Sequence, residues 1–328
     1  MPEDHDDLGC VIALDVGGTG MKGALLDRDF NTLVTLRRPT PRTLGPDAVV
    51  DEITATVRRL AREATARGRD VHRAGVVVPG VVAEELRSAV YSANIGWRGL
   101  PLADLLEART RLPVTLGHDV RAGGAAECFL GAARGARNVL FVAIGTGIAA
   151  AVICDGRPVR ADGYAGELGH VVVEPDGDPC GCGGHGCLET VASASAIAAA
   201  FTVRSGRPVA GAAAVAASVA RGDADARAVW DRAADALASA LATATTLLAP
   251  EVIVLGGGLA EAGDLLLDPV RARLAERLTF QRQPALVRAA LGDEAGCLGA
   301  GLAAWHAVDG ANGANGAARA VRVERPGG

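Results

Sequence analysis

Three strand-like apolar runs of this 328-residue chain each end in a glycine turn, and this recurrence restricts its possible folds more than any other feature. The runs are CVIALDV (10–16) before GGTG, NVLFVAI (138–144) before GTG, and EVIVL (251–255) before GGG. Strands that alternate with helical segments are typical of α/β proteins, whose open sheets bind ligands at the carboxyl ends of their strands. The pattern therefore predicts an α/β fold in which the glycine turns are binding loops. The strand–turn–strand pattern near residue 10 recurs near residue 139, which hints at two related halves.

Further elements follow from local patterns. Two apolar runs around a polar turn at 24–40 predict a hairpin. Asp47 precedes apolar residues at helical spacing, which predicts a helix that it caps. The Ala-rich stretch from 189 to about 248 predicts several helices, and further helices are expected at 259–278 and 296–308.

Composition excludes several classes of protein. With 49% hydrophobic and 22% charged residues, the chain is globular rather than disordered. The net charge of −5 and the lack of a basic stripe argue against nucleic acid as the main partner. The acidic start MPEDHDDLG is unlike a signal peptide, and no apolar run reaches membrane-spanning length. We expect a soluble cytoplasmic protein with no nucleic-acid or membrane partner.

The first glycine turn, DVGGTGMK (15–22), allows three interpretations. It contains the GxGxxG pattern of dinucleotide sites, but the chain continues as a strand rather than a helix, and arginines stand where an acidic residue is expected. It is not a Walker loop, and glycine pairs alone usually mark a tight hairpin. An acidic strand end, two glycines, Thr and Lys nevertheless form a turn of exposed N–H groups that suits a phosphate. With the other two turns it predicts an ATP and Mg²⁺ site formed by Asp15, Gly17, Gly18, Thr19, Lys22, Gly145, Thr146, Gly147, Gly256, Gly257 and Gly258.

Taken together, the motifs resemble the ROK family of sugar kinases, within the actin/hexokinase superfamily. They occur in family order and span residues 10 to 308. The matching pieces are LDVGGTGMKGALLD (14–27), VVVPGVV (76–82), GHDVRAGGAAE (117–127), FVAIGTGIAAAVICDGRPVRADGYAGELGHV (141–171), CGCGGHGCLE (180–189) and VIVLGGGLA (252–260).

The resemblance implies a two-domain actin/hexokinase-like (ribonuclease H-like) α/β fold with the active site in an interdomain cleft. We expect a small α/β domain at 10–116, completed by the helix at 296–308, and a large domain at 117–295 that carries a zinc loop. A flexible amino terminus at 1–9 and a disordered tail at 309–328 flank them. Family members are usually dimers or tetramers, so we expect a homodimer or homotetramer.

The cysteine-rich stretch GDPCGCGGHGCLE (177–189) has a ligand role in the family. The resemblance makes His170, Cys180, Cys182 and Cys187 ligands of a structural Zn²⁺. One imidazole and three thiolates form a closed tetrahedral set, as structural zinc sites do. A Cys-x-Cys pair is awkward for a disulfide, and the redox Cys-x-x-Cys spacing is absent. We interpret His185 as an exposed loop residue, with contact to the metal left open.

The resemblance also assigns the sugar-binding and catalytic residues. Asp119 would be the general base, although an aspartate there also suits a helix N-cap. Asp15 would help to hold Mg²⁺ through water. Sugar hydroxyls would be held by Gly80, Asn94, His118, Asp119, Glu167, His170 and Glu189. We expect zinc to fix two loops so that Glu167 and Glu189 face one pocket.

One departure bears on specificity. The family's usual dipeptide is Asn-Asp, and its Asn holds sugar hydroxyls, whereas this chain has His118-Asp119. Either the imidazole replaces that contact or the preferred sugar has changed. A second departure, alanines at 149–151 in place of common glycines, is mild.

The implied activity is ATP-dependent phosphorylation of a hexose, with conversion of glucose to glucose 6-phosphate expected first. N-acetylmannosamine, N-acetylglucosamine, fructose and allose remain open as substrates. A non-catalytic sugar-sensing regulator is the alternative from another class, although a phosphate loop that begins by residue 15 leaves no room for an amino-terminal DNA-binding domain.

Overall fold

The computed structural model describes residues 8–323, which form two compact units. Unit 1 contains the chain up to Gly123 together with the chain from Glu294 onward. Unit 2 contains Gly124–Asp293. Each unit has its own five-stranded sheet and its own hydrophobic core.

The sheet of unit 1 has the strand order β3-β2-β1-β4-β8. β1 pairs antiparallel with β2, and β2 with β3, which confirms the predicted hairpin. β1, β4 and β8 run parallel, so their carboxyl ends lie at one edge of the sheet. The bounds are β1 (Gly9–Val16), β2 (Gly20–Leu26), β3 (Thr32–Pro39), β4 (Asp70–Val78) and β8 (Val114–His118).

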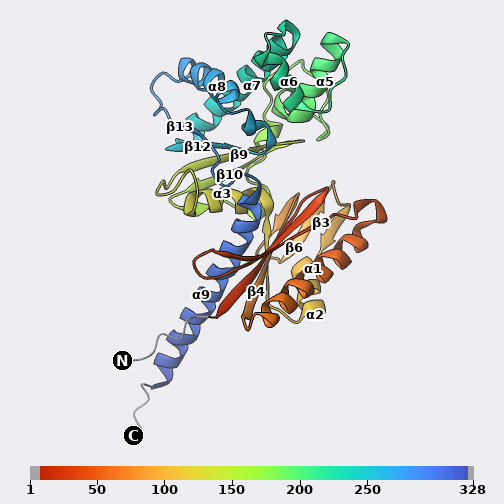
Figure 1. Ribbon diagram of the computed structural model, residues 1–328. Coiled ribbons are helices and arrows are strands. Elements are labelled where there is room, and N and C mark those ends of the chain that lie inside the picture. Colours follow the sequence, from red (N-terminus) through yellow and green to blue (C-terminus); the bar gives the residue numbers. More distant parts are fainter. Residues whose placement is uncertain (1–7, 324–328) are drawn as a thin grey trace. The chain divides into compact units, whose positions relative to one another are not determined.

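Helices cover both faces of this sheet (Figure 1). α1 (Pro46–Ala66) and α2 (Leu102–Thr110) pack on one face, and α9 (Ala295–Val323) packs on the other. The apolar stripe predicted for α1 is buried. Asp47 is not the cap, because the helix starts at Pro46 after Gly45. Proline is well suited to the first helical position, and Asp47 then lies in the first turn, where the helix dipole favours a carboxylate.

A small sheet of β5 (Val81–Ala83), β6 (Ser88–Ser92) and β7 (Trp97–Leu100) follows β4. The chain enters it through Gly80, whose φ of 102° favours glycine. A Cβ at Gly80 would also overlap the carbonyl of Tyr91. Trp97 is buried and donates its indole N–H to the carbonyl of Pro46, so it is a packing residue.

Unit 2 repeats the strand arrangement of unit 1, with the order β11-β10-β9-β12-β13. β9 and β10 are antiparallel, whereas β9, β12 and β13 run parallel. A hairpin beside parallel strands in both units agrees with the recurrence seen in the sequence. The bounds are β9 (Val139–Ile144), β10 (Ile148–Cys154), β11 (Arg157–Pro158), β12 (Val252–Gly256) and β13 (Ala285–Arg288).

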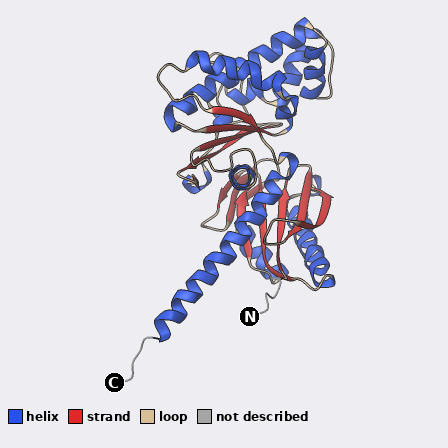
Figure 2. Ribbon diagram, turned by 60° about the vertical axis from the view of Figure 1, so that its left-hand side comes forward, coloured by secondary structure: helices blue, strands red, loops and turns tan. Residues whose placement is uncertain are grey.

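A layer of helices covers one face of this sheet (Figure 2), as the Ala-rich sequence predicts. Small side chains let the helices approach one another closely, and Phe201 and Trp230 fill the remaining space at the centre of the core. The helices are α4 (Leu188–Ala192), α5 (Ala194–Ser205), α6 (Ala212–Ala220), α7 (Ala224–Leu248) and α8 (Asp264–Arg277).

The chain ends differ in part from expectation. We expected a disordered tail from residue 309, whereas α9 extends to Val323. The flexible amino terminus predicted at 1–9 lies mostly outside the described residues, although Gly9 begins β1. Residues 324–328 also lie outside them. Within residues 8–323, no helix has the length and apolarity needed to cross a bilayer.

Candidate active site

The carboxyl edge of the unit 1 sheet carries the predicted chemistry. Asp15 is the penultimate residue of β1, Gly80 comes two residues after β4, and Asp119 directly follows β8 as the first residue of α3 (Asp119–Phe129). Because these strands are parallel and adjacent in the order β1-β4-β8, the three positions lie at one edge. A side chain at Gly296 would overlap the Asp15 carboxylate, so the amino-terminal turn of α9 lies against this acid. That end of a helix favours negative charge.

The first glycine turn, Gly17 to Thr19, joins β1 to β2 in a shape fixed by hydrogen bonds. Gly17 donates its N–H to the carbonyl of Gly20 at 2.9 Å. Thr40 braces the turn from outside, because its hydroxyl donates to the carbonyl of Gly17 at 2.6 Å and its N–H to that of Thr19 at 3.1 Å. These bonds fix the shape of the turn.

Two further predicted residues lie beside this turn. Lys22 stands opposite Asp15 in the register of β1 and β2. Asn94 is exposed in the turn after β6, and its Cβ lies 3.9 Å from the position that a Cβ on Gly18 would take. Unit 1 thus brings Asp15, the glycine turn and the candidate sugar contact Asn94 together.

Asp119 has the electrostatics of a base that works near neutral pH. Burial, followed by the negative charge of Asp15, raises the pKa of its carboxyl group to about 7. The Val120 N–H, which donates to Oδ1 at 2.7 Å, and the positive charge of Arg121 act in the opposite direction. A carboxyl group with a pKa near ambient pH is about half ionised and is basic enough to take a proton.

His118 is a buried neutral imidazole. Its side chain is 8% exposed, and its Nδ1 accepts the backbone N–H of Arg121 at 3.3 Å. Burial, followed by the positive charge of Arg121, lowers the pKa of His118 to about 3. The other ring nitrogen, Nε2, lies 3.4 Å from Oδ1 of Asp119.

The two glycine turns of unit 2 also share one edge. Gly145, Thr146 and Gly147 join β9 to β10, and Gly256, Gly257 and Gly258 follow β12, which is parallel to β9. Gly257 has a φ of 78°, and a Cβ there would overlap the backbone of Ile144. Glycine is thus required for this close approach, which leaves flat backbone at the sheet edge.

Glu189 ties the second turn to the zinc-loop side of unit 2. It lies in the first turn of α4, and its Oε2 accepts the backbone N–H of Ile148 at 2.9 Å. A Cβ on Gly147 would overlap the same oxygen. The hydroxyl of Ser195 donates to the carbonyl of Thr146 at 2.6 Å and holds the turn from α5.

His170, Cys180, Cys182 and Cys187 converge on one point of unit 2. Their ligand atoms all lie within 4.8 Å of one another. The sulfur of Cys180 is 3.6 Å from Nδ1 of His170, and the sulfurs of Cys182 and Cys187 are 3.7 Å apart. Tetrahedral zinc with bonds of about 2.3 Å to sulfur and 2.0 Å to nitrogen gives separations of about 3.6 and 3.8 Å for such pairs. The four side chains therefore fit a closed zinc site, and exposed His185 is not among the converging groups.

Glu167 flanks this cluster. It precedes the single turn Leu168–His170, and its Oε2 lies 3.9 Å from Nε2 of His170. The imidazole thus turns Nδ1 to the sulfurs and Nε2 toward a carboxylate, as metal-binding histidines usually do. Glu167 and Glu189 stand on the two segments that the four ligands would join.

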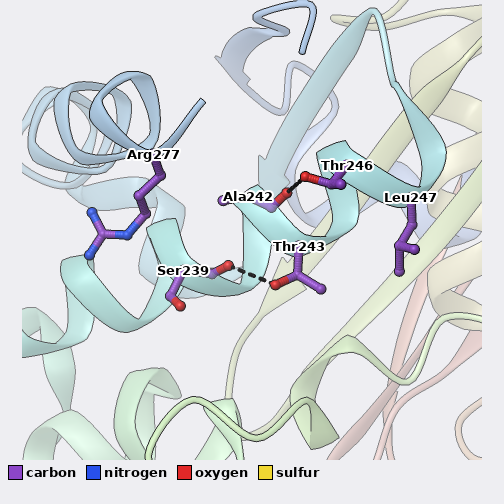
Figure 3. A pocket seen from close by; sticks show the side chains of 6 residues that line it. All are labelled: Ser239, Ala242, Thr243, Thr246, Leu247 and Arg277. Atoms are coloured by element: carbon purple, nitrogen blue, oxygen red, sulfur yellow. Dashed lines mark hydrogen bonds between the residues drawn. The ribbon is translucent and has the colours of Figure 1, made fainter. Parts of the chain in front are cut away.

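A separate hollow lies on the helical layer of unit 2 (Figure 3). It has a volume of about 460 Å³, and the hydroxyls of Thr243 and Thr246 in it donate to carbonyls of their own helix. It lies near the end of α7, which leads into the start of β12, so it is at the opposite edge from the glycine turns. Its lining is Ser239, Ala242, Thr243, Thr246, Leu247 and Arg277.

Residues 11–307 match the sequence profile of the ROK family. The chain belongs to the ROK family. It is 35% identical to a glucokinase of Halalkalibacterium halodurans, over 88% of this chain and 93% of that one. It is 32% identical to an N-acetylmannosamine kinase of Salmonella arizonae, over 89% and 97%. A crystal structure of a ROK family glucokinase from Streptomyces griseus, in complex with glucose and AMPPNP, superposes with a TM-score of 0.77 at 30% identity, over 91% and 100%. The predicted actin/hexokinase-like α/β fold is confirmed.

Sequence reasoning missed the groups that brace the site. Thr40 and Ser195 hold the glycine turns, and buried Arg121 pairs with Glu84 behind Asp119. Hydroxyls and arginines are common in loops and helices, so none of them stood out. The available signal was Arg121, a charged residue among the small apolar residues of α3.

Proposed function

We propose that this ROK-family protein is an ATP-dependent sugar kinase that phosphorylates glucose to glucose 6-phosphate. The observation that carries the proposal is Asp119, a carboxylate with a pKa of about 7 at the sheet edge that also carries Asp15 and the first glycine turn. This is where phosphoryl transfer to a hydroxyl needs a base.

In the proposed reaction, the sugar hydroxyl oxygen forms a bond to the γ-phosphorus of ATP. The bond from that phosphorus to the bridging oxygen breaks, and ADP leaves. Asp119 takes the hydroxyl proton. The turns at Gly17–Thr19 and Gly145–Gly147 would cradle phosphates, Lys22 would add positive charge, and Gly256–Gly258 would offer flat backbone to the adenine.

The metals have distinct proposed roles. Mg²⁺ would neutralise the phosphate oxygens, and Asp15 would hold it through its water shell. Zn²⁺ would join the segments that carry Glu167 and Glu189. The fit of the four ligand atoms to tetrahedral zinc supports this role, and the metal contributes rigidity rather than reactivity because no ligand position is left open.

The identity of the sugar substrate is the more specific part of the proposal. Glucokinases and N-acetylmannosamine kinases are similarly related to this chain, at 35% and 32% identity, so overall similarity does not separate the two substrates. Predicted sugar contacts are Gly80, Asn94, Glu167, His170 and Glu189, with His118 considered below. N-acetylglucosamine, fructose and allose belong in the same comparison.

The test is ATP turnover on a panel of these hexoses and N-acetylhexosamines, with Mg²⁺ present and zinc retained. We expect glucose to have the highest kcat/KM, and Asp119→Asn to lose most turnover while still binding sugar. The control is Glu85→Gln, which removes an exposed carboxylate of the same unit. A higher kcat/KM for another sugar would keep the kinase proposal but change its substrate. Sugar binding without turnover on any substrate would favour a non-catalytic sugar-sensing regulator.

The remaining predictions about partners are unchanged. Small-molecule sugar and ATP are the expected ligands, with neither nucleic acid nor membrane. A homodimer or homotetramer and a cytoplasmic location stay predictions.

A further inference from the structure

The residue that departs from the family pattern, His118, has one nitrogen committed to the backbone. It precedes α3, and its Nδ1 accepts the N–H of Arg121, the third residue of that helix. This is the bond that a helix N-cap makes with one of the unpaired N–H groups of the first turn. An imidazole that accepts at Nδ1 carries its proton on Nε2 when neutral.

The Nε2–H faces the base. Nε2 lies 3.4 Å from Oδ1 of Asp119, and the same oxygen accepts the Val120 N–H at 2.7 Å. Oδ1 is therefore the oxygen that faces the protein, with one hydrogen bond from Val120 and the His118 ring close by. The geometry leaves Oδ2 as the oxygen that would receive a proton from a bound hydroxyl.

The side chain of Arg121 anchors the start of α3 to the small sheet. Its side chain is 4% exposed, and its Nε lies 3.1 Å from Oε1 of Glu84. Its Nη2 donates to the carbonyl of Val82 on β5 at 3.0 Å. One residue thus joins the start of α3 to the small sheet that begins at Gly80, while its backbone N–H sets the tautomer of His118.

Gly80 leads into the small sheet and Asn94 follows β6, and both are predicted sugar contacts. The hydrogen bond from Arg121 to β5 of this sheet therefore bears on function. We propose that His118 and Arg121 are positioning residues that orient Asp119 toward the sugar hydroxyl, and that His118 does not itself bind the sugar. This inference rests on the proposed function. It gives position 118 a third possible role beside a sugar contact and a changed specificity.

A measurement that needs no turnover tests the tautomer directly. The protein contains six histidines, so ¹⁵N-histidine spectra of the wild type minus those of His118→Asn identify the ring. We expect Nδ1 without a proton and Nε2 with one, unchanged from pH 5 to pH 9, because burial and the nearby guanidinium disfavour a charged ring. Asp119 and Arg121 are the charged groups that face the ring, and Glu84 balances the arginine. A ring that titrates near pH 6.5, or that carries its proton on Nδ1, overturns the proposal.

The kinetic test separates positioning from sugar binding. Serine is a good N-cap and carries no amide that could bind sugar, so His118→Ser keeps the helix start but removes the Nε2–H. On the best sugar of the panel we expect kcat to fall about tenfold, with KM for the sugar within about twofold of the wild type. A changed sugar KM or sugar preference with kcat intact means that His118 binds sugar, and refutes the proposal.

Variants of the ion pair extend the test. Arg121→Met removes the guanidinium that pairs with Glu84 and carries a risk of misfolding, so Arg121→Lys and Glu84→Gln accompany it. We expect Arg121→Lys to recover part of the kcat that Arg121→Met loses, with the sugar KM constant throughout. Glu85→Gln, next to the pair but exposed, should match the wild type. Equal loss of kcat and sugar affinity in all variants would indicate that Arg121 has a purely structural role, and would refute the inference. Absence of turnover in the wild type would instead refute the proposed function, and the histidine spectra would still decide the tautomer.

Discussion

Replacing Asp119 by asparagine should make unit 1 more stable while it abolishes turnover. The fold raises the pKa of this carboxyl from 3.8 to about 7, so the native state holds its proton where the unfolded state releases it. Between about pH 4 and pH 7 the native protein therefore binds more protons, and its free energy of unfolding falls as the pH rises through this window. Asparagine keeps an oxygen for the Val120 N–H but carries no charge to bury.

The size of the effect follows from the shift. One pKa unit corresponds to about 1.4 kcal/mol, so the shift sets an upper limit of about 4 kcal/mol for the gain above pH 7. Because 26% of the Asp119 side chain is exposed, water relieves part of this cost, and we expect about 2 to 4 kcal/mol.

Hydrogen exchange of peptides from β1 and β4 measures this gain within unit 1. At pH 8 in the absence of ligands, the variant should exchange at least about 30-fold more slowly than the wild type, since about 1.4 kcal/mol corresponds to a tenfold change. At pH 5 the difference should be smaller, because less of the window has been crossed. Glu85→Gln should show no difference at either pH. Equal exchange in Asp119→Asn and wild type at pH 8 would show that the carboxylate is not desolvated, and would remove the physical basis for its role as base.

Three further results are expected. In the wild type, kcat/KM for the sugar should rise with pH through about 7 and then level off, because the base works only when Asp119 is ionised; a flat profile from pH 5.5 to 9 would contradict this. Cys187→Ser should lose the one zinc per chain that metal analysis should find in the wild type, and sugar binding with it, whereas Cys154→Ser, outside the cluster, should keep both. Gly147→Ala should raise the sugar KM severalfold, because its methyl group would displace the Glu189 carboxylate; an unchanged KM would argue against Glu189 as a sugar contact.

The strands and their glycine turns were predictable because both signals are local. An apolar run of five to seven residues predicts a buried strand, and glycines directly after it predict a turn where backbones approach closely. Gly80 and Gly257 illustrate this, since a side chain at either would overlap a neighbouring backbone. The convergence of the four cysteine and histidine ligands followed from the family resemblance, since His170 is separated from Cys180 by a loop whose path the spacing does not fix.

Helix ends were harder, because several residues can serve the same purpose. Asp47 has the chemistry of a cap, but Pro46 precedes it and starts the helix one residue earlier. Glu127 shows the opposite problem. It belongs to the family motif around Asp119, yet it is fully buried and accepts the N–H groups of Ala132, Ala290 and Leu291. Its position in the motif does not indicate that it accepts hydrogen bonds from backbone N–H groups far away in the sequence.

The pair of Arg121 and Glu84 could not be found from sequence, because 37 residues separate its members. The two residues meet only because the fold packs the small sheet against the start of α3. The same is true of His118, whose two nitrogens have different partners. Sequence shows that an imidazole can donate or accept, but only the tertiary structure shows which nitrogen faces Arg121 and which faces Asp119.

This division suggests why histidine is tolerated where the family usually has asparagine. Asparagine carries its acceptor, Oδ1, at the same distance along the side chain as Nδ1 of histidine, so either residue caps α3 by accepting the N–H of Arg121. The two residues differ only in the group that remains. An asparagine offers an amide N–H₂ at the δ position, whereas histidine offers one N–H further out, at Nε2, and that nitrogen lies beside Asp119. The substitution thus preserves the helix start and places an N–H beside Asp119 in place of the amide that asparagine would offer.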